Sequence, residues 1–291
     1  MLSEFFQFTF SGVTLGAIYA LVALGFTLIY NASHVINFAQ GEFLMIGGMG
    51  TVVLLEAGLP LPLAMLGALL LAGVAGVVLY KLAIAPAKKA DVVTLIIITI
   101  GASIFLRGLA QFFWGKQYHA LPRFSATESL SVGGATLLTQ SLWVLGIAVV
   151  LVVALALFFN RSRLGKAILA TSMNKDAARL AGIKTQTILT LAFGISALLG
   201  AVAGVIVAPI TFTAYDVGIM LGLKGFVAAA IGGLGSSTGA IVGGLLLGLS
   251  EAYTAGYISS DYKDAVPFVI ILAILFFLPN GLFGSRAVER V

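Results

Sequence analysis

The side chains that could do chemistry are few in this sequence and lie far apart. His34 and His119 are the only histidines, cysteine is absent and no H-E-x-x-H motif occurs, so we predict no metal site. Residues 235–239 (GSSTG) match the G-x-S-x-G pattern of hydrolases, but that pattern needs a strand-to-helix turn, an acid and a histidine. Here the pattern joins two predicted helices, which argues against a hydrolase. The sequence shows no acid–base or nucleophile constellation, and this disfavours a membrane-embedded enzyme. We therefore predict no catalytic residues and no cofactor.

Arg107 and Lys224 are ionisable residues within apolar segments. Such a residue is a functional candidate in a membrane protein. Both side chains can instead extend their charged ends to the nearer membrane interface, and we favour that interpretation. Glu42 and Glu251 fall near segment ends, where solvation explains them as well as a function does. An ion-coupled carrier usually buries acids, and the acids here cluster near predicted loops, which argues against that alternative. These loop acids are Asp91, Glu128, Asp176, Asp216, Asp261 and Asp264.

The composition indicates that the chain lies in a membrane. Of its 291 residues, 60% are hydrophobic and 9% are charged. A soluble domain carries about 25% charged residues, so most of this surface must face lipid or other apolar helices. Runs of roughly 18–22 apolar residues match the length that crosses a bilayer as a helix. We predict an all-α polytopic membrane protein with about nine transmembrane helices, within a range of about eight to ten. The predicted segments are 9–30, 43–55, 61–80, 92–113, 142–159, 188–208, 220–234, 240–257 and 266–278.

Two of these segments, 43–55 and 220–234, are short and rich in glycine, so we expect broken or re-entrant helices there. Transporter sites tend to lie where helices are interrupted in corresponding halves of the chain. Unwound backbone N–H groups could face a substrate carboxylate, and carbonyl groups could face its ammonium. The alternative is a cytoplasmic turn between two crossings. The candidate translocation-path residues are Asn37, Gln40, Gly41 and Glu42 in the first half and Gly232, Gly233 and Gly235 in the second.

Basic residues are concentrated in three predicted loops, and cytoplasmic loops are enriched in lysine and arginine. Residues 81–89, 161–184 and 286–290 hold three, six and two of them, eleven of the sixteen in the chain. The polar segment 115–140 holds only two, so we expect it to be external. The predicted crossings between the basic loops are even in number, which makes the assignments consistent and places the N-terminus outside. The first basic residue is Lys81, so no cleavable signal is evident.

The loop 161–184 contains a short predicted helix. Asn174 can accept a hydrogen bond from a free backbone N–H at its start, and Asp176 lies in the first turn, where the helix dipole favours an acid. Gly182 can adopt the left-handed conformation that ends a helix. An isolated helix of two turns is marginal in water, so we expect it to dock in a groove on a partner protein. The residues expected at this contact are Asp176, Ala177, Ala178, Leu180 and Gly182.

Several motifs in this chain resemble those of a known family. Residues 176–182 resemble the EAA-type coupling loop of ABC importer permeases, with aspartate replacing glutamate and without the Leu-Pro that often follows. Residues 16–25 (GAIYALVALG) and 35–42 (VINFAQGE) resemble the N-terminal signature of LivH-type branched-chain amino-acid permeases. The segments that resemble the C-terminal signature are 226–235 (FVAAAIGGLG), 239–244 (GAIVGG) and 279–284 (PNGLFG). The motifs occur in the expected order along nearly the whole chain.

The resemblance implies a single permease domain over residues 1–291, with a cytoplasmic coupling loop at 161–184, in a bacterial inner (cytoplasmic) membrane. The implied partners are a second, related permease subunit, two cytoplasmic ATPase subunits, a periplasmic amino-acid-binding protein and the lipid bilayer, with no nucleic acid. The substrate would be leucine, isoleucine, valine or another neutral amino acid, an amide or urea. Ala167 follows Gly165 and Lys166, so no Walker A motif is present and ATP hydrolysis would belong to the partners. An ion-coupled secondary amino-acid carrier remains the alternative.

Overall fold

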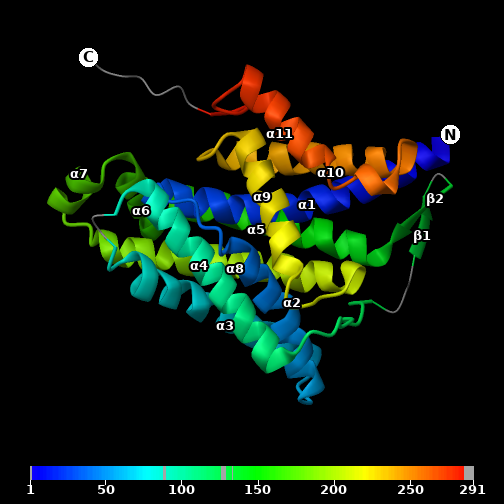
Figure 1. Ribbon diagram of the computed structural model, residues 1–291, viewed down its shortest axis with the longest axis horizontal. Helices are drawn as coiled ribbons and strands as arrows, with labels where there is room; N and C mark the ends of the chain where they lie inside the picture. Colours follow the sequence, from blue (N-terminus) through cyan, green and yellow to red (C-terminus); the bar gives the residue numbers. More distant parts are fainter. Residues whose placement is uncertain (1, 88–89, 126–128, 133, 285–291) are drawn as a thin grey trace.

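The computed structural model describes residues 2–87, 90–125, 129–132 and 134–284, and in these residues the fold is almost entirely helical (Figure 1). The α-helices are α1 (Leu2–Ser33), α2 (Gln40–Glu56), α3 (Leu61–Leu79), α4 (Val92–Trp114), α5 (Thr139–Arg161), α6 (Arg163–Met173), α7 (Lys175–Leu180), α8 (Thr185–Thr211), α9 (Val217–Gly232), α10 (Ser237–Tyr257) and α11 (Val266–Phe277). The other elements are a π-helical turn η1 (Tyr80–Ile84), a 3-10 turn η2 (Ser260–Tyr262) and an antiparallel hairpin of β1 (Ser129–Val132) and β2 (Ala135–Leu138).

Each of the nine predicted apolar segments forms a helix, namely α1 to α5 and α8 to α11. Among the described residues, five stretches are long and apolar enough to cross a membrane, and α9 with α10 adds a sixth if the pair is one span bent by 119°. The all-α polytopic class is therefore confirmed. A count of about nine spans is not supported, because α2, α9 and α11 contain only 17, 16 and 12 residues. The five long stretches are Leu2–Ser33, Leu61–Ile84, Val92–Trp114, Thr139–Arg161 and Thr185–Thr211.

Helix α1 lies at the centre of the bundle, and its residues from Gly16 to Ile29 are all buried. It packs along α10 through glycines that leave no room for a side chain. A Cβ atom at Gly16 would lie 2.8 Å from the Cα of Leu245, and one at Gly12 would lie 2.9 Å from the Cα of Leu249. Small residues at four-residue spacing let helix backbones approach closely in lipid. The glycine spacing in α1 therefore builds the central helix pair.

The outer helices expose apolar side chains. Leu70 on α3, Phe112 on α4, Val150 on α5 and Leu272 on α11 are all exposed. Their backbone polar groups are satisfied within the helices, so these faces can lie against lipid or against another apolar helix. The protein is thus built as a multi-pass membrane bundle rather than around a water-covered surface.

The two ends of the bundle hold different loops (Figure 1). At one end lie α6, α7, the chain after α1 and the α9–α10 turn, where Asn31 Nδ2 donates to Gly235 O at 2.9 Å. At the other end the β1–β2 hairpin meets the start of α1, and Gln7 Oε1 accepts from Thr136 N at 2.8 Å. The loops predicted on opposite membrane sides therefore lie at opposite ends. Four basic residues used in that prediction lie outside the described residues, namely Lys88, Lys89, Arg286 and Arg290.

Candidate functional site: coupling helix and translocation path

Helix α7 has two turns and is capped at both ends by its own sequence. Asn174 Oδ1 accepts hydrogen bonds from the N–H groups of Asp176 and Ala177, at 3.0 and 2.9 Å. At the other end Gly182 has a φ of +83°, and its N–H donates to Arg179 O at 2.9 Å. This arrangement satisfies backbone groups that a helix end otherwise leaves free. The predicted start and end of this helix are confirmed.

The outer face of the α6–α7 arm carries large apolar side chains. Leu180 is 91% exposed, and Met173 at the end of α6 is 88% exposed. A large apolar side chain exposed on a short helix suits docking into a groove on a partner. Asp176 and Ala177 are exposed as well, whereas Ala178 is only 5% exposed. Of the residues predicted to contact a partner, Ala178 therefore packs against this chain's own body.

Polar and apolar contacts fix the α6–α7 arm to the bundle. Ser162 Oγ accepts from Gly165 N–H at 2.8 Å and caps α6, while Ile168 is almost fully buried in the core. Arg179 Nε donates to Thr185 Oγ1, the first residue of α8, at 3.1 Å. Since α8 packs on α1, α2 and α3, a displacement of α7 would reach the centre of the bundle through α8.

The chain between α1 and α2 returns into the bundle before α2 begins, and we call residues 34–42 the re-entrant segment. Gln40, the first residue of α2, is fully buried, and its Nε2 donates to Ser196 O at 3.0 Å. Ser196 Oγ lies 2.7 Å from Gln40 Oε1 and 2.8 Å from the carbonyl oxygen of Gly25. Gly25 is about two turns before the end of α1, so α2 starts inside the bundle. Gly41 follows in backbone contact with Gly218 of α9, where a side chain on either residue would collide with the other's carbonyl.

Glu42 and Asn37 place polar groups inside the bundle near the start of α2. Glu42 is 1% exposed, and Ser103 Oγ donates to its Oε1 at 2.8 Å. Glu42 Oε2 and Asn37 Nδ2 are buried with no hydrogen-bond partner among the described residues. Arg107 and Asp216 lie close enough to interact electrostatically with Glu42. Of the two explanations left open for Glu42, solvation does not fit, because the chain before α2 carries this carboxylate into the bundle.

Lys224 forms a buried ion pair, contrary to the prediction that its charged end extends to the membrane interface. Its side chain is 6% exposed, and its Nζ lies 2.8 Å from Glu251 Oε1 and 2.7 Å from Asp264 Oδ1. Glu251 is buried too, so solvation, one of the two explanations left open for it, does not fit either. The ion pair joins α9 to α10 and to the loop before α11, and the fold alone brings these elements together.

Gly232, Gly233 and Gly235 form the tight turn between α9 and α10. Gly233 and Gly235 both have a φ of +97°, a conformation that favours glycine. The N–H of Phe283 donates to Gly232 O at 2.9 Å, so the segment 279–284 packs directly on this turn. The three segments that resemble the C-terminal signature thus gather at one place. The geometry matches a turn between two helices and gives these glycines a steric role.

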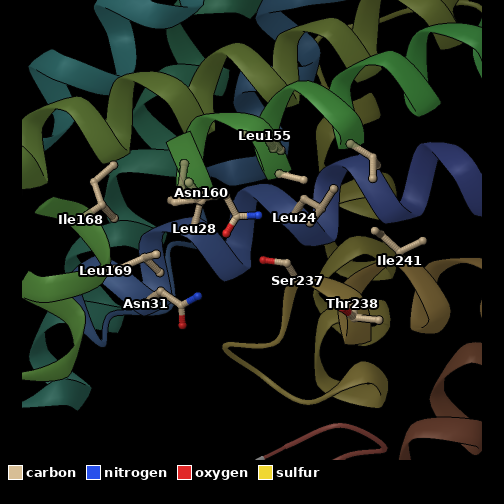
Figure 2. Close-up of a pocket in the computed structure, with 13 residues that line it drawn as sticks. Leu24, Leu28, Asn31, Leu155, Asn160, Ile168, Leu169, Ser237, Thr238 and Ile241 are labelled. Atoms are coloured by element: carbon tan, nitrogen blue, oxygen red, sulfur yellow. The ribbon is translucent and has the colours of Figure 1, made fainter. Parts of the chain in front are cut away.

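A cavity of about 390 Å³, which we call the inner cavity, lies between α1, α5, α6 and α10 (Figure 2). It is at the end of the bundle that holds α7. Leu28 and Leu155 belong to its apolar wall, and Asn31, Asn160 and Ser237 lie around the same space (Figure 2). A pocket with apolar walls and a few polar groups suits a small molecule with an aliphatic part and a polar part. The sequence did not predict this cavity, because four separate helices supply its lining.

These features define a multi-pass α-helical membrane permease. They are an apolar bundle, a re-entrant segment with buried polar groups, a cavity between four helices and an exposed helical arm at one end. A comparison with known families is more specific. The chain belongs to the family described as branched-chain amino acid transport system / permease component, whose sequence model matches residues 8–275.

The chain is similar over almost its whole length to known permeases. It is 34% identical over 305 residues to the high-affinity branched-chain amino acid transport system permease protein LivH of Salmonella typhimurium, with 99% of this chain and 98% of LivH covered. It is also 34% identical over 304 residues to the corresponding protein BraD of Pseudomonas aeruginosa, with the same shares covered. The resemblance to LivH-type permeases is confirmed, and these relatives are permease subunits rather than enzymes.

A solved structure of PsaBC from Streptococcus pneumoniae in complex with Fab has the same fold. The TM-score is 0.53 at 14% sequence identity, and the match covers 97% of this chain and 98% of the other. At this identity the similarity supports the arrangement of the helices and nothing finer. The family assignment therefore rests on the sequence comparisons.

Proposed function

We propose that this chain is one permease subunit of an ATP-driven importer in a bacterial inner membrane, and that it carries branched-chain or related neutral amino acids. The full-length similarity to LivH and BraD supports the transport class. The observation that supports ATP coupling is α7, a capped helix of two turns that exposes Leu180. Residues 1–291 act as a single permease domain beside a second, related permease. Two cytoplasmic ATPases and a periplasmic amino-acid-binding protein complete the assembly.

The end of the bundle that holds α6 and α7 is the cytoplasmic end in this proposal. Six basic residues lie in the loop 161–184, and cytoplasmic loops are enriched in such residues. The opposite end, where His119 Nδ1 lies 3.1 Å from Glu56 Oε1, faces the periplasm. The short helices α2, α9 and α11 then reach only part of the membrane depth. Irregular backbone at that depth is tolerated where protein surrounds it.

Helix α7 docks in a groove on an ATPase subunit, with Leu180 as the anchor. Short amphipathic helices bind partners by placing apolar side chains in such grooves. A single large side chain in a dry pocket commonly supplies much of the binding energy. Asn174 and Gly182 keep the helix in shape at its two ends. The contact between Arg179 and Thr185 carries the movement of the ATPase to α8.

The translocation path adjoins the re-entrant segment and the inner cavity. Gly25 of α1 contacts the Gln40 side chain, and its neighbour Leu24 lines the cavity of about 390 Å³. Glu42 Oε2 and Asn37 Nδ2 are buried polar atoms available to a passing substrate. The apolar cavity wall suits an aliphatic side chain, and its amides and hydroxyls suit polar groups without net charge.

An ion-coupled carrier is the second candidate function. Glu42 and Glu251 are buried, and buried acids inside a membrane bundle commonly bind protons or ions. The sequence argued against a carrier because its acids cluster near predicted loops. The burial of Glu42 and Glu251 weakens that argument. The family and the exposed α7 favour ATP coupling instead.

Uptake into proteoliposomes separates the two candidates. The complete assembly is reconstituted with both permeases, the ATPases and the binding protein outside, and leucine uptake is measured with enclosed ATP or with a proton gradient. We expect uptake with ATP and none with the gradient alone. A matched preparation contains this chain by itself, and we expect no uptake under either condition. Gradient-driven uptake by the chain alone would establish the carrier and contradict the proposal.

A further inference from the structure

A cluster of charged side chains lies inside the bundle, and the proposed function does not use it. Lys224 Nζ on α9 donates to Glu251 Oε1 on α10 at 2.8 Å and to Asp264 Oδ1, before α11, at 2.7 Å. Tyr19 OH on α1 donates to Glu251 Oε2 at 2.7 Å, and Lys224 Nζ lies 5.7 Å from the centre of the Tyr19 ring. Three helices and one loop therefore converge on a single ammonium group.

A cavity of about 480 Å³ adjoins this cluster. Tyr19, Lys224 and Glu251 all line it, so the charged groups meet open space as well as one another. Gln7 and Lys263 also line it, and Gln7 contacts the β1–β2 hairpin at the end of the bundle opposite α7. The cavity is thus placed to receive a molecule from the external side.

The rest of the cavity wall is mostly apolar, with Ser11 and Thr211 as its other polar residues. Leu15 of α1, Leu221 of α9 and Ala255 of α10 contribute to it. A small cavity that combines apolar surface with cationic and anionic groups suits a ligand with both charges and an aliphatic part. A neutral amino acid has this chemistry.

The three charged groups differ in their access to water. The side chains of Lys224 and Glu251 are 6% and 7% exposed, whereas that of Asp264 is 48% exposed. One buried cation, Lys224, faces two carboxylates, and the other lysine of the cavity, Lys263, is exposed. A buried charge is costly without a partner, so Lys224 and Glu251 hold each other in place. Asp264 is the one member that can leave for solvent at small cost.

We propose that this outer cavity binds the backbone of the substrate amino acid, with the α-carboxylate replacing Asp264 on Lys224 and the ammonium group beside Glu251. The inference rests on the proposed function, which supplies an amino acid as substrate. Asp264 shows that Lys224 accepts a second carboxylate, and such charge-assisted contacts are strong. With the zwitterion bound, Lys224, Glu251 and the ligand together carry no net charge. Asp264 occupies the carboxylate position until the ligand displaces it.

Cysteine protection in the assembled transporter tests this site directly. The chain contains no cysteine, so Ala255→Cys places a single thiol of this subunit in the cavity wall. In right-side-out vesicles, leucine should slow alkylation of this thiol. At the same concentration 4-methylpentanoate, which lacks the ammonium, and 3-methylbutylamine, which lacks the carboxylate, should not. Leu221→Cys reports from another part of the wall and should respond in the same way.

Variants of the charged cluster make the test specific. Asp264→Asn should lower the leucine concentration that gives half-protection by about tenfold, because a competing carboxylate no longer occupies the site. The paired variant Lys224→Gln with Glu251→Gln should abolish protection while leaving no buried charge unpaired. Asp261→Asn, which changes an exposed acid near the same loop, should leave protection unchanged.

Two results would overturn the inference. One is leucine import by both reporter variants without protection of either thiol. The other is an unchanged half-protection concentration in Asp264→Asn. ATP-driven import by the cysteine-free parent is measured in the same vesicles, and its absence would contradict the proposed function rather than this site alone.

Discussion

Lys224 on α9 and Glu251 on α10 are buried neighbours, with Nζ 2.8 Å from Oε1, although 27 residues separate them in the sequence. Both side chains are taken out of water, so each depends on the other for its charge to be tolerated. The pair ties the two arms of the bent α9–α10 unit together. It also ties them to α1, because Tyr19 donates to the same carboxylate.

Removing one partner of this pair should therefore destabilise the protein more than removing both. Glu251→Ala leaves the buried Lys224 ammonium with only the half-exposed Asp264 as a partner, and breaking a buried pair commonly costs up to about 3–5 kcal/mol. The double variant Lys224→Leu with Glu251→Leu should lose much less stability, since no charge remains buried. Thermal unfolding of the purified permease in detergent measures the difference. Glu56→Ala, at an acid whose side chain is 59% exposed, is the control and should unfold like the parent. A double variant less stable than Glu251→Ala would argue against the paired burial.

Gly182 should be replaceable by asparagine but not by valine. No other group lies within 4 Å of a Cβ built at this position, so the only penalty is the φ of +83°. The left-handed conformation costs an ordinary residue roughly 1–2 kcal/mol, and asparagine tolerates it better than a β-branched residue does. Gly182→Val should lower leucine uptake at matched membrane levels, and Gly182→Asn should retain most of it. Equal uptake by the two variants would show that the end of α7 does not matter for coupling.

The inner cavity should discriminate between substrates by size. Ala156 lines it on α5, whereas Ala154, which is also exposed on the same helix, does not. Ala156→Phe fills part of the space and should reduce uptake of leucine relative to alanine by about tenfold, a typical discrimination for an apolar pocket. Ala154→Phe should leave the ratio unchanged. The binding protein is the same in both assays, so its own selectivity cancels. An unaltered leucine-to-alanine ratio in Ala156→Phe would remove this cavity from the path.

The orientation of the bundle can be measured with single cysteines. Met173 is 88% exposed at the α7 end, and Tyr118 is 74% exposed at the other end. In sealed cells an impermeant thiol reagent should label Tyr118→Cys and not Met173→Cys, because the α7 end is proposed to be cytoplasmic. Labelling should reverse in inverted vesicles. External labelling of Met173→Cys in sealed cells would contradict both the orientation and the role of α7.

Local sequence patterns predicted much of the fold. Asn174 and Gly182 bound α7 as expected, because capping depends only on residues within a few positions. Apolar runs likewise predicted the helices, because an apolar stretch in lipid must satisfy its own backbone. The predicted count of about nine spans is not supported, because a run of apolar residues does not reveal whether a helix begins at the membrane surface. Gln40 begins α2 inside the bundle, held by Ser196 from 156 residues away.

The charged and cavity-lining residues were harder to predict for the same reason. Glu42 and Lys224 looked solvated or able to reach an interface, and only their partners on other helices show that they are buried. Ala178 belonged to the predicted contact face of α7, yet it faces the body of the protein, while Leu180 faces outward. On a helix of two turns, the buried face depends on what packs against it, and the local sequence does not contain that information.

Co-purification of an ATPase tests the coupling role of α7 most directly. Leu180→Asp places a charge on the most exposed apolar side chain of α7, and Ile258→Asp makes the same change at a 73% exposed residue at the opposite end. The tagged permease is purified from membranes at matched levels, and the bound ATPase is quantified. Loss of one interface anchor should reduce the ATPase recovered with Leu180→Asp by about tenfold or more, while Ile258→Asp retains it in full. Full retention of the ATPase by Leu180→Asp would contradict the assignment of α7 as the coupling helix.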